Sequence, residues 1–226
     1  MTDGDAKRAA AIAALEELPE GGIVGLGTGS TAKLFIEEVG KLVQNGRKLR
    51  GVPTSEASRI QAQALGIEVL SEDGPWDIDV TIDGADEVDP RLDLIKGGGG
   101  AHLREKIVNY SSRKNVIIVD ESKLSPALGT RWSVPVEVVR FAAGATKKHL
   151  SAFGTPVLRE RDGAPFRTDS GNVIYDVATG ALADAAALDR ALREVPGVVE
   201  TGLFIGRADI VIIAGANGIE RRRARR

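Results

Sequence analysis

The sequence predicts an α/β fold in which an open parallel-sheet domain is interrupted by a smaller α+β domain. In the first half of the chain, apolar strand-like segments alternate with helical ones, which is the order of α/β proteins. The segment 115–119 is almost wholly apolar and β-branched, as is typical of a parallel strand that is buried on both faces. From about Trp132, short strands and helices follow a βαββαβ-like order, which favours a small α+β domain.

The elements of the first domain follow from hydrophobic periodicity and from cap and stop residues. Thr2 or Asp3 is the expected cap of the first helix, and Thr54 or Ser55 is the expected cap of the third. We expect helices at 3–17, from about 31 to 45, at 54–66 and from about 101, and strands at 23–26, 49–53, 67–70, 78–82, 115–119 and 209–214.

The second domain is predicted from shorter segments. We expect strands at 134–139, 156–158, 172–176 and 198–201, and helices at 145–153 and 184–194. The apolar segment 209–214 resembles the strands of the first half, so it is expected to rejoin their sheet. The predicted domains are therefore residues 1–130 with 207–226, and residues 131–206.

Composition and charge exclude several classes of partner. The formal net charge of -2 gives no general attraction to nucleic acid or to a membrane surface. No window reaches the roughly 18 apolar residues of a membrane span, and the first twenty residues lack a signal-peptide pattern, so a cytoplasmic protein is expected. The absence of cysteine excludes disulfides, thiol catalysis and thiolate metal sites. The basic run 220–226 is expected to be a solvated tail, with contact to a neighbouring subunit or a polyanion as the alternative.

The stretch 83–106 holds most of the chemistry. It combines two close carboxylates, a lysine, four consecutive glycines and a glutamate inside a predicted helix: Asp83, Asp86, Lys96, Gly97 to Gly100 and Glu105. Glycines that precede a helix let a ligand approach the backbone and aim N–H groups at an anion. A mobile surface loop is the alternative for the glycines, and a solvent-facing helix residue is the alternative for Glu105. His102 is expected to face solvent, with substrate contact as the alternative.

A second glycine loop, GLGTGST, follows the predicted strand 23–26 and precedes a helix. Backbone N–H groups and the hydroxyls of Thr28, Ser30 and Thr31 make it a predicted phosphate-binding loop. A dinucleotide site is disfavoured, because no acidic residue ends the next strand about twenty residues later. A Walker loop is excluded because the Lys-Ser/Thr pair is missing, and the spacing after Asp83 excludes an EF-hand.

Polar residues follow several strands at the edge where open α/β sheets bind ligands. Thr28, Asp83, Lys96 and Lys123 are expected to meet there, whereas Lys7 lies off the apolar stripe of the first helix and reads as a solvent lysine. The two histidines carry no ligand motif, so neither a metal nor another cofactor is expected.

Seven motifs occur in order along nearly the whole chain: GLGTGST, TSEAS, DGADEVDP, LIKGGGGAHLREKIV, VDESKL, TDSGNVIYD and VPGVVETGLF. Together they resemble the type A family of ribose-5-phosphate isomerases, which interconverts ribose 5-phosphate and ribulose 5-phosphate in the pentose phosphate pathway. The resemblance implies a Rossmann-like domain, a ferredoxin-like second domain, and a homodimer or homotetramer that acts on a small sugar phosphate.

The resemblance also implies roles for single residues. Glu105 would be the proton acceptor. The residues themselves suggest that Lys96, with N–H groups of the glycine loop, stabilises the enediolate and that Asp83 moves hydroxyl protons, including those of ring opening. The implied substrate-binding residues are Thr28, Gly29, Ser30, Thr31, Asp83, Gly84, Ala85, Asp86, Lys96, Gly97, Gly98, Gly99, Lys123 and Lys7. Whether the phosphate meets the loop 28–31 or the lysines stays open. The alternatives are a non-catalytic sugar-phosphate sensor and a related deaminase, lactonase or CoA transferase.

Overall fold

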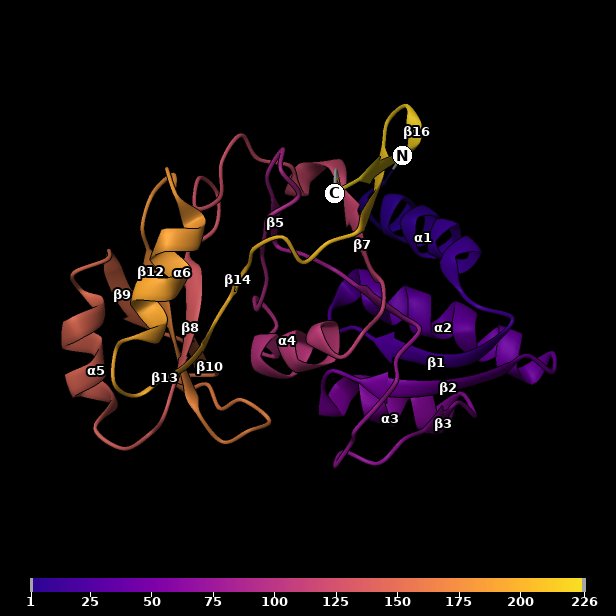
Figure 1. The fold of residues 1–226 in the computed structure, drawn as a ribbon, viewed down its shortest axis with the longest axis horizontal. Coiled ribbons are helices and arrows are strands. Elements are labelled where there is room, and N and C mark those ends of the chain that lie inside the picture. Colours follow the sequence, from indigo (N-terminus) through magenta and orange to yellow (C-terminus); the bar gives the residue numbers. More distant parts are fainter. Residues whose placement is uncertain (1, 225–226) are drawn as a thin grey trace. The chain divides into compact units, whose positions relative to one another are not determined.

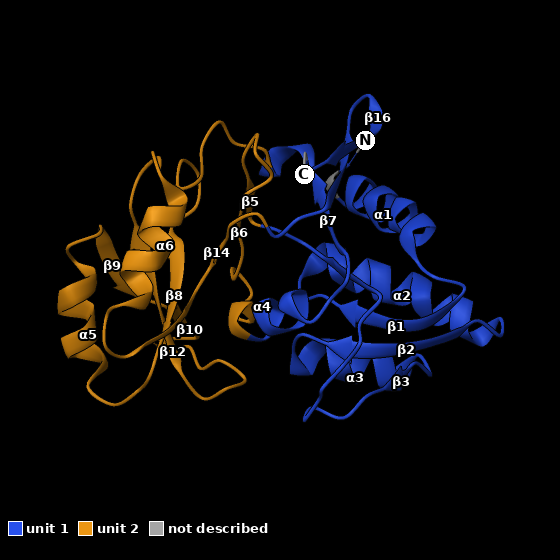
Figure 2. Cartoon of the chain, in the orientation of Figure 1, with its two compact units in different colours: residues 1–85, 104–123, 207–226 blue, residues 86–103, 124–206 orange. Residues whose placement is uncertain are grey.

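The computed structural model describes residues 2–224, in which the chain forms two compact units (Figures 1 and 2). The first unit contains residues up to 85, residues 104–123 and the chain from 207 onward. The second contains residues 86–103 and 124–206. The chain therefore passes between the units four times, and two of these passages flank the acidic and glycine-rich stretch.

The first unit is built on a seven-stranded sheet of order β16-β15-β7-β4-β1-β2-β3. Its elements are α1 (Asp3–Ala13), a 3₁₀ turn η1 (Ala14–Glu17), β1 (Gly21–Leu26), α2 (Ser30–Gln44), β2 (Lys48–Pro53), α3 (Glu56–Ala64), β3 (Glu68–Val69), β4 (Val80–Asp83), α4 (His102–Tyr110, entered from the second unit), β7 (Asn115–Asp120), η2 (Glu121–Lys123), β15 (Ile210–Gly215) and β16 (Gly218–Arg223). All neighbouring strands pair in parallel except β15 with β16. Without β16 the order is that of a doubly wound Rossmann-like sheet, which confirms the predicted fold class.

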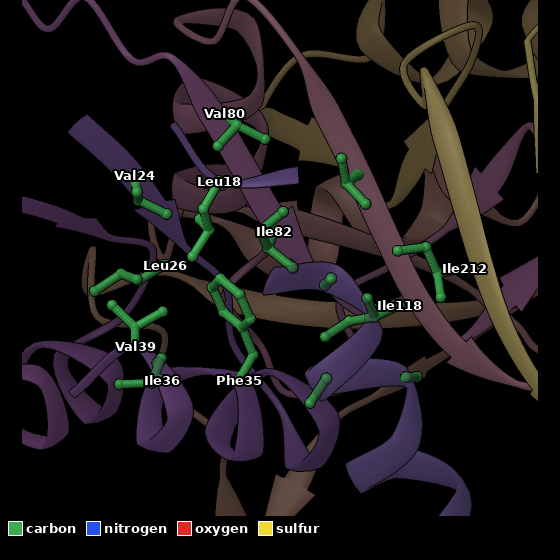
Figure 3. Close-up of a cluster of buried hydrophobic side chains, with 14 of the residues drawn as sticks. Leu18, Val24, Leu26, Phe35, Ile36, Val39, Val80, Ile82, Ile118 and Ile212 are labelled. Atoms are coloured by element: carbon green, nitrogen blue, oxygen red, sulfur yellow. The ribbon is translucent and has the colours of Figure 1, made fainter. Parts of the chain in front are cut away.

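Alternate residues of the parallel strands form the main core of the first unit. Side chains such as Val24, Ile82 and Ile118 face α1 and α2. From α2, Phe35 and Ile36 project onto the sheet (Figure 3). On the opposite face, Val108 of α4 packs with Val52 and Ile78. Because parallel strands are covered on both faces, β7 is buried at every position, as its apolar sequence predicts.

The caps that position the helices are partly those expected. Thr2 caps α1 through a capping box with Asp5, and the Ser55 hydroxyl accepts the N–H of Ser58 at the start of α3. By contrast, α2 begins at Gly29 without any side-chain cap. The N–H groups of its first turn are therefore left for another partner.

The second unit has a four-stranded antiparallel sheet of order β13-β8-β12-β9, covered by α5 and α6. Its elements are β5 (Glu87–Val88), β6 (Leu94–Ile95), β8 (Val134–Val138), α5 (Ala143–Leu150), β9 (Thr155–Leu158), β10 (Glu160–Arg161), β11 (Ala164–Pro165), β12 (Val173–Ala178), α6 (Ala185–Arg193), β13 (Val198–Thr201) and β14 (Leu203–Phe204). The chain order β8-α5-β9-β12-α6-β13 is the predicted βαββαβ pattern. The short strands β5, β6 and β14 form a separate three-stranded sheet, and β10 and β11 form a hairpin.

The division into units differs in place from the predicted boundaries. Residues 86–103 and 124–130 belong to the second unit, although the sequence grouped them with the sheet domain. In the prediction and in the structure alike, the chain returns to the domain of the parallel sheet at residue 207. That residues 131–206 fold as a domain by themselves stays a prediction.

The prediction of a solvated, frayed tail at 220–226 is wrong for residues 220–223, which lie in the strand β16 (Gly218–Arg223). This strand pairs antiparallel with β15 from Gly215↔Gly218 to Ile210↔Arg223. The side chains are charged and mostly exposed, yet the backbone completes the edge of the sheet. Charged side chains on an edge strand hinder pairing with a further chain, so this composition suits the position. Residues 225–226 of the predicted tail lie outside the described part.

Candidate active site

The order of strands in the first unit reverses between β1 and β4, which are paired neighbours. In open α/β sheets, ligands bind at the carboxyl ends of the strands at such a reversal. The loop after β1 is Gly27 to Gly29, and the loop after β4 begins at Asp83. Both loops were predicted to bind substrate, and the topology brings them together within one unit.

Two backbone contacts join these loops. The N–H of Gly27 donates to the carbonyl of Ile82 at 3.0 Å, and the N–H of Thr28 donates to Oδ1 of Asp83 at 3.0 Å. A Cβ on Gly27 would lie 2.2 Å from Oδ1 of Asp83, so only glycine lets the two loops approach so closely. Gly27 therefore has a packing reason of its own, besides any contact with a ligand.

The hydroxyl of Thr28 lies in a group of hydroxyls from the start of α3. Its Oγ1 is 2.7 Å from Oγ1 of Thr54, 2.8 Å from Oγ of Ser55 and 3.3 Å from Oγ of Ser58. Ser58 in turn donates to the carbonyl of Gly27 at 2.7 Å. The sequence predicted only that Thr54 or Ser55 caps a helix and gave Ser58 no role, and the TSEAS motif is the one signal that could have pointed to this group of hydroxyls.

The first turn of α2 offers the clearest anion-binding geometry of the first unit. Gly29 has φ 114°, a conformation that favours glycine, and it leads into the helix without a side-chain cap. Ser30 is exposed, whereas Thr31 is buried. Uncapped N–H groups and the positive end of the helix dipole favour a phosphate at such a position.

Asp83 is the buried carboxylate at the end of β4, with a relative exposure of 2%. Its Oδ1 accepts the N–H of Thr28 and, at 2.7 Å, that of Gly84. Gly84 and Ala85, the next two residues of the chain, are half-buried. Two backbone donors on one oxygen fix the direction of the carboxylate, so Asp83 is held rigidly at the reversal of the sheet.

Glu105 lies in the first turn of α4 and is 3% exposed. The alternative of a solvent-facing helix glutamate is therefore wrong. Its neighbour Lys106 is equally buried, at 3%. A carboxylate that is removed from bulk water and placed near a helix N-terminus is a suitable group for moving a proton.

The two lysines predicted for the first unit are less enclosed. Lys123 closes η2 after β7 and is half-buried, and Lys7 on α1 is half-buried as well. The turn before Lys123 is fixed by Asp120, whose Oδ1 accepts the N–H of Ser122 at 2.9 Å. Both lysines keep part of their surface in water, as expected for groups that attract an anionic substrate.

Within the second unit, Lys96 is 3% exposed. Its backbone N–H donates to the carbonyl of Gly202 at 2.9 Å, and its Nζ lies 5.4 Å from the centre of the Phe204 ring. This cation–π contact and the pairing with β14 fix the position of an otherwise flexible side chain. Asp86, half-buried, accepts the N–H of Gly98 through Oδ2 at 2.7 Å.

The four glycines form a tight turn. The N–H of Gly100 donates to the carbonyl of Gly97 at 2.9 Å, and both residues have positive φ, 106° at Gly97 and 85° at Gly100. Gly99 is the exposed residue of the turn. A side chain at Gly98 would collide with a neighbour, because its Cβ would lie 2.7 Å from Oδ1 of Asp86.

The expectation that His102 faces solvent is wrong. The residue is 0% exposed, and its Nε2 lies 3.9 Å from Oε2 of the buried Glu137. Its ring also lies under the glycine turn, where a Cβ on Gly97 would come within 2.7 Å of Nδ1. His102 is thus part of the support of the turn, for which the sequence carried no signal.

Within residues 2–224, no group of three or more His, Asp or Glu side chains is arranged to hold a metal ion. In the same part of the chain, every helix is too short or too polar to cross a lipid bilayer. Metal-free chemistry stays a prediction that the experiments below test.

The chain is similar to known proteins both in sequence and in fold. The family model of ribose 5-phosphate isomerase A (phosphoriboisomerase A) matches residues 50–218. Ribose-5-phosphate isomerase A of Rhodopseudomonas palustris (strain TIE-1) is 50% identical over 227 residues, which cover 97% of this chain and 97% of the relative.

Two solved structures cover both units. Ribose 5-phosphate isomerase A from Methanocaldococcus jannaschii superposes with a TM-score of 0.93 at 38% identity, over 98% of this chain and 100% of that one. A D-ribose-5-phosphate isomerase in complex with phospho-erythronic acid superposes with a TM-score of 0.94 at 37% identity, over 99% of this chain and 100% of the other.

Proposed function

The chain belongs to the ribose 5-phosphate isomerase A family, and on that premise we propose that it interconverts D-ribose 5-phosphate and D-ribulose 5-phosphate through an enediolate. The observation that carries the proposal is the buried carboxylate of Glu105 in the first turn of α4, the helix that follows the four glycines in the chain. The comparisons give no support to a sensor, a deaminase, a lactonase or a CoA transferase.

Proton transfer is the role that we propose for Glu105. The carboxylate removes the proton from C2 of the open-chain aldose, and the negative charge passes to O1. The same carboxylate then returns the proton to C1, while O1 gains a proton and O2 loses one, which gives the ketose. One positioned carboxylate is sufficient for both steps, and a positioned acid–base group contributes about 10²–10⁴-fold to such a reaction.

Charge stabilisation is the role that we propose for Lys96 and the glycine turn. The enediolate concentrates negative charge on O1 and O2, and preorganised donors stabilise such charge most effectively where water is excluded. Lys96 is buried and held by Phe204, so little reorganisation is needed when the charge develops.

The two aspartates handle sugar hydroxyls in this proposal. Asp83 takes the proton of the C1 hydroxyl as the furanose ring opens, and its rigid backbone contacts support this role. Asp86 holds hydroxyl groups of the open chain. The loop residues Gly84, Ala85 and Gly97 to Gly99 would contribute backbone contacts.

The phosphate, we propose, binds at the N-terminus of α2. The missing side-chain cap, the exposed Ser30 and the positive φ of Gly29 support this choice. Thr31 and the lysines Lys7 and Lys123 would complete the anion site, whereas the Thr28 hydroxyl is engaged with Thr54 and Ser55. From the sequence alone, the loop 28–31 and the lysines are alternative binding sites for the phosphate.

The ligand of the solved relative supports an enediolate. Phospho-erythronic acid carries a planar carboxylate whose two oxygens correspond to O1 and O2 of the enediolate, one carbon shorter than the sugar phosphate. We expect it to inhibit this chain competitively with ribose 5-phosphate. We also propose a cytoplasmic homodimer or homotetramer, which cell fractionation and light scattering of the purified protein test.

The reaction route is tested with EDTA-treated protein in D₂O. Ribose 5-phosphate is added, and both ketose formation and deuterium incorporation are followed by NMR. Turnover with solvent deuterium in the product supports the enediolate. Turnover without any deuterium would fit either hydride transfer or a proton that Glu105 returns before it exchanges, and Glu105→Gln separates the two, since only the second route needs the carboxylate. Loss of turnover on removal of metal, or full turnover of Glu105→Gln, would contradict the proposal.

A further inference from the structure

The side chain of Arg159 joins the strand end after β9 to the glycine turn within the second unit. Its Nη1 donates to the carbonyl of Gly97 at 2.6 Å and lies 3.3 Å from that of Gly98. The backbone N–H of Arg159 donates to the carbonyl of Ile174 at 2.8 Å, at the end of β9. A residue far along the chain is therefore fixed against two consecutive carbonyls of the turn.

The guanidinium is itself anchored. Nε of Arg159 donates to Oδ2 of Asp176 on β12 at 2.9 Å, and Nη2 bonds to Oδ1 of the same carboxylate. The side chain of Arg159 is only 13% exposed. A bidentate arginine–carboxylate pair holds the plane of the guanidinium, so Nη1 has one direction in which to donate.

Because a peptide unit is planar, a donor that holds its carbonyl also fixes the direction of its N–H group. Among the described residues the only cis peptide bond is Gly74–Pro75, so the peptides of the turn are trans. In a trans peptide the C=O and the N–H point in opposite directions. The Gly97–Gly98 peptide shows the result, because its carbonyl accepts from Arg159 while its N–H donates to Asp86 at 2.7 Å.

The next peptide follows the same rule. The carbonyl of Gly98 faces Arg159, so the N–H of Gly99 points to the opposite side, where Gly99 is exposed. Glycine peptides flip easily, because glycine populates positive and negative φ about equally. Without a donor on the carbonyl side, a flip would present an oxygen in place of the Gly99 N–H. Hydrogen bonds to a carbonyl also polarise the peptide and strengthen its N–H as a donor.

We propose that Arg159 is a positioning residue that holds the Gly98–Gly99 peptide so that the Gly99 N–H donates to the oxyanion formed during isomerisation. This inference rests on the proposed function. The charge of Arg159 is balanced by Asp176, so the residue acts through the peptide and not as a counterion of the substrate.

The test compares Arg159→Gln and Arg159→Lys with wild type and with Arg193→Gln. Arg193 is a matched control, because it bridges Asp189 and Glu200 in the same unit at 3.0 and 2.9 Å and has no contact with the turn. Asp176→Asn is the second variant: it keeps Arg159 and removes its anchor, should Arg159→Gln not fold.

We expect kcat of Arg159→Gln to fall about 10- to 100-fold, below the 10²–10³-fold loss of a deleted oxyanion donor, with KM changed less than about threefold. Asp176→Asn should show a smaller loss in kcat, and Arg159→Lys an intermediate one. The inhibition constant of phospho-erythronic acid should rise in parallel. Arg193→Gln should lower thermal stability while kcat is kept. A kcat of Arg159→Gln within about twofold of wild type, or a rise in KM alone, would overturn the proposal.

A second readout separates this proposal from the proposed function. In ¹⁵N-glycine-labelled protein, the Gly99 amide signal, assigned by its loss in Gly99→Ala, should shift when phospho-erythronic acid is added. The shift should be lost in Arg159→Gln. If wild type showed the shift but no turnover, the proposed reaction would fail and the positioning role would stand. If the Gly99 signal did not respond in wild type, the positioning role would fail even with full turnover.

Discussion

The backbone N–H of Thr28 donates to Oδ1 of Asp83 at 3.0 Å, and this bond joins the loops that follow β1 and β4 at the reversal of the parallel sheet. Through it, the predicted phosphate loop and the predicted acid–base loop form one rigid group. The glycine before Thr28 makes the contact possible, and that dependence leads to a direct test.

Gly27→Ala should move Asp83. The new Cβ would lie 2.2 Å from Oδ1 and 2.6 Å from the Cα of Asp83, so either the carboxylate or the loop must shift. We expect kcat to fall at least about tenfold, and overpacking of about 1–3 kcal/mol to lower the melting temperature. Gly144→Ala in α5 is the control, since a Cβ there meets no atom within 4 Å. Wild-type kcat in Gly27→Ala would show that the close approach is not required.

Asp83→Asn separates the chemistry of this residue from its structural role. The amide oxygen can still accept the N–H groups of Thr28 and Gly84, so the melting temperature should change little. The loss of a carboxylate that moves hydroxyl protons should lower kcat about 10²-fold. Steady-state kinetics beside differential scanning calorimetry check both points. If stability and kcat fell together, the carboxylate would be mainly structural.

Lys123→Met tests the proposed phosphate site. We expect KM for ribose 5-phosphate to rise about tenfold, the equivalent of about 1.4 kcal/mol, with kcat nearly unchanged. Lys48→Met, which removes an exposed lysine at the start of β2 and so at the opposite end of the parallel strands, should leave KM unchanged. Inorganic phosphate should inhibit wild type more strongly than Lys123→Met. An unchanged KM in Lys123→Met would remove this lysine from the site.

The pH dependence of stability should report on Asp93. Burial, and secondarily the nearby Asp89, raise the pKa of Asp93 above its ordinary value of 3.8, against the lowering effects of the Gly206 N–H and Arg91. The folded state therefore holds this proton more tightly than the unfolded chain does. Its stabilising contribution is fully present below pH 3.8 and is lost as pH rises through the raised pKa.

Asp93→Asn removes that titration and keeps an oxygen for the Gly206 N–H, which Oδ1 of Asp93 accepts at 2.7 Å. Relative to the variant, wild type should therefore lose stability as pH rises from about 4. Urea unfolding of both proteins across this range measures the difference. A constant difference between pH 3 and pH 7 would show that the pKa of Asp93 is not raised.

Deletion of β16 should destabilise the first unit. A chain ending at Asn217 would expose the edge of β15, whose residues Ile210 to Ala214 are buried. We expect the melting temperature to fall by more than about 5 °C, and aggregation to increase, because an unprotected apolar edge pairs with other chains. A chain ending at Ala224 keeps β16 and should behave like wild type. Equal stability of the two truncations would mean that β16 contributes nothing.

The sequence predicted the parts of the fold that have a strong local signal. The apolar segment 115–119 and the strand–glycine–helix order around Gly27 identify buried parallel strands and a loop at their ends. The strand β16 was missed because its residues are charged, and only its partner β15 makes it a strand. Two-residue strands such as β5 and β6 show no periodicity at all.

The same distinction applies to the site. Asp83 and Lys96 stand out because charged residues beside glycines at strand ends predict ligand binding, whereas Glu105 stands out only through the resemblance of its motif to the family. His102 and Arg159 carried no such signal, because their importance depends on contacts with the glycine turn that only the folded chain forms. A sequence shows which residues can do chemistry more readily than it shows which residues hold them in place.

The most direct test of the central claim is the kcat of Glu105→Gln with ribose 5-phosphate in EDTA. Glutamine keeps the size and burial of the side chain but cannot accept the C2 proton. The account predicts a fall in kcat of about 10²–10⁴-fold, with unchanged melting temperature and retained binding of phospho-erythronic acid. A kcat within about tenfold of wild type in a folded, ligand-binding variant would contradict proton transfer through Glu105.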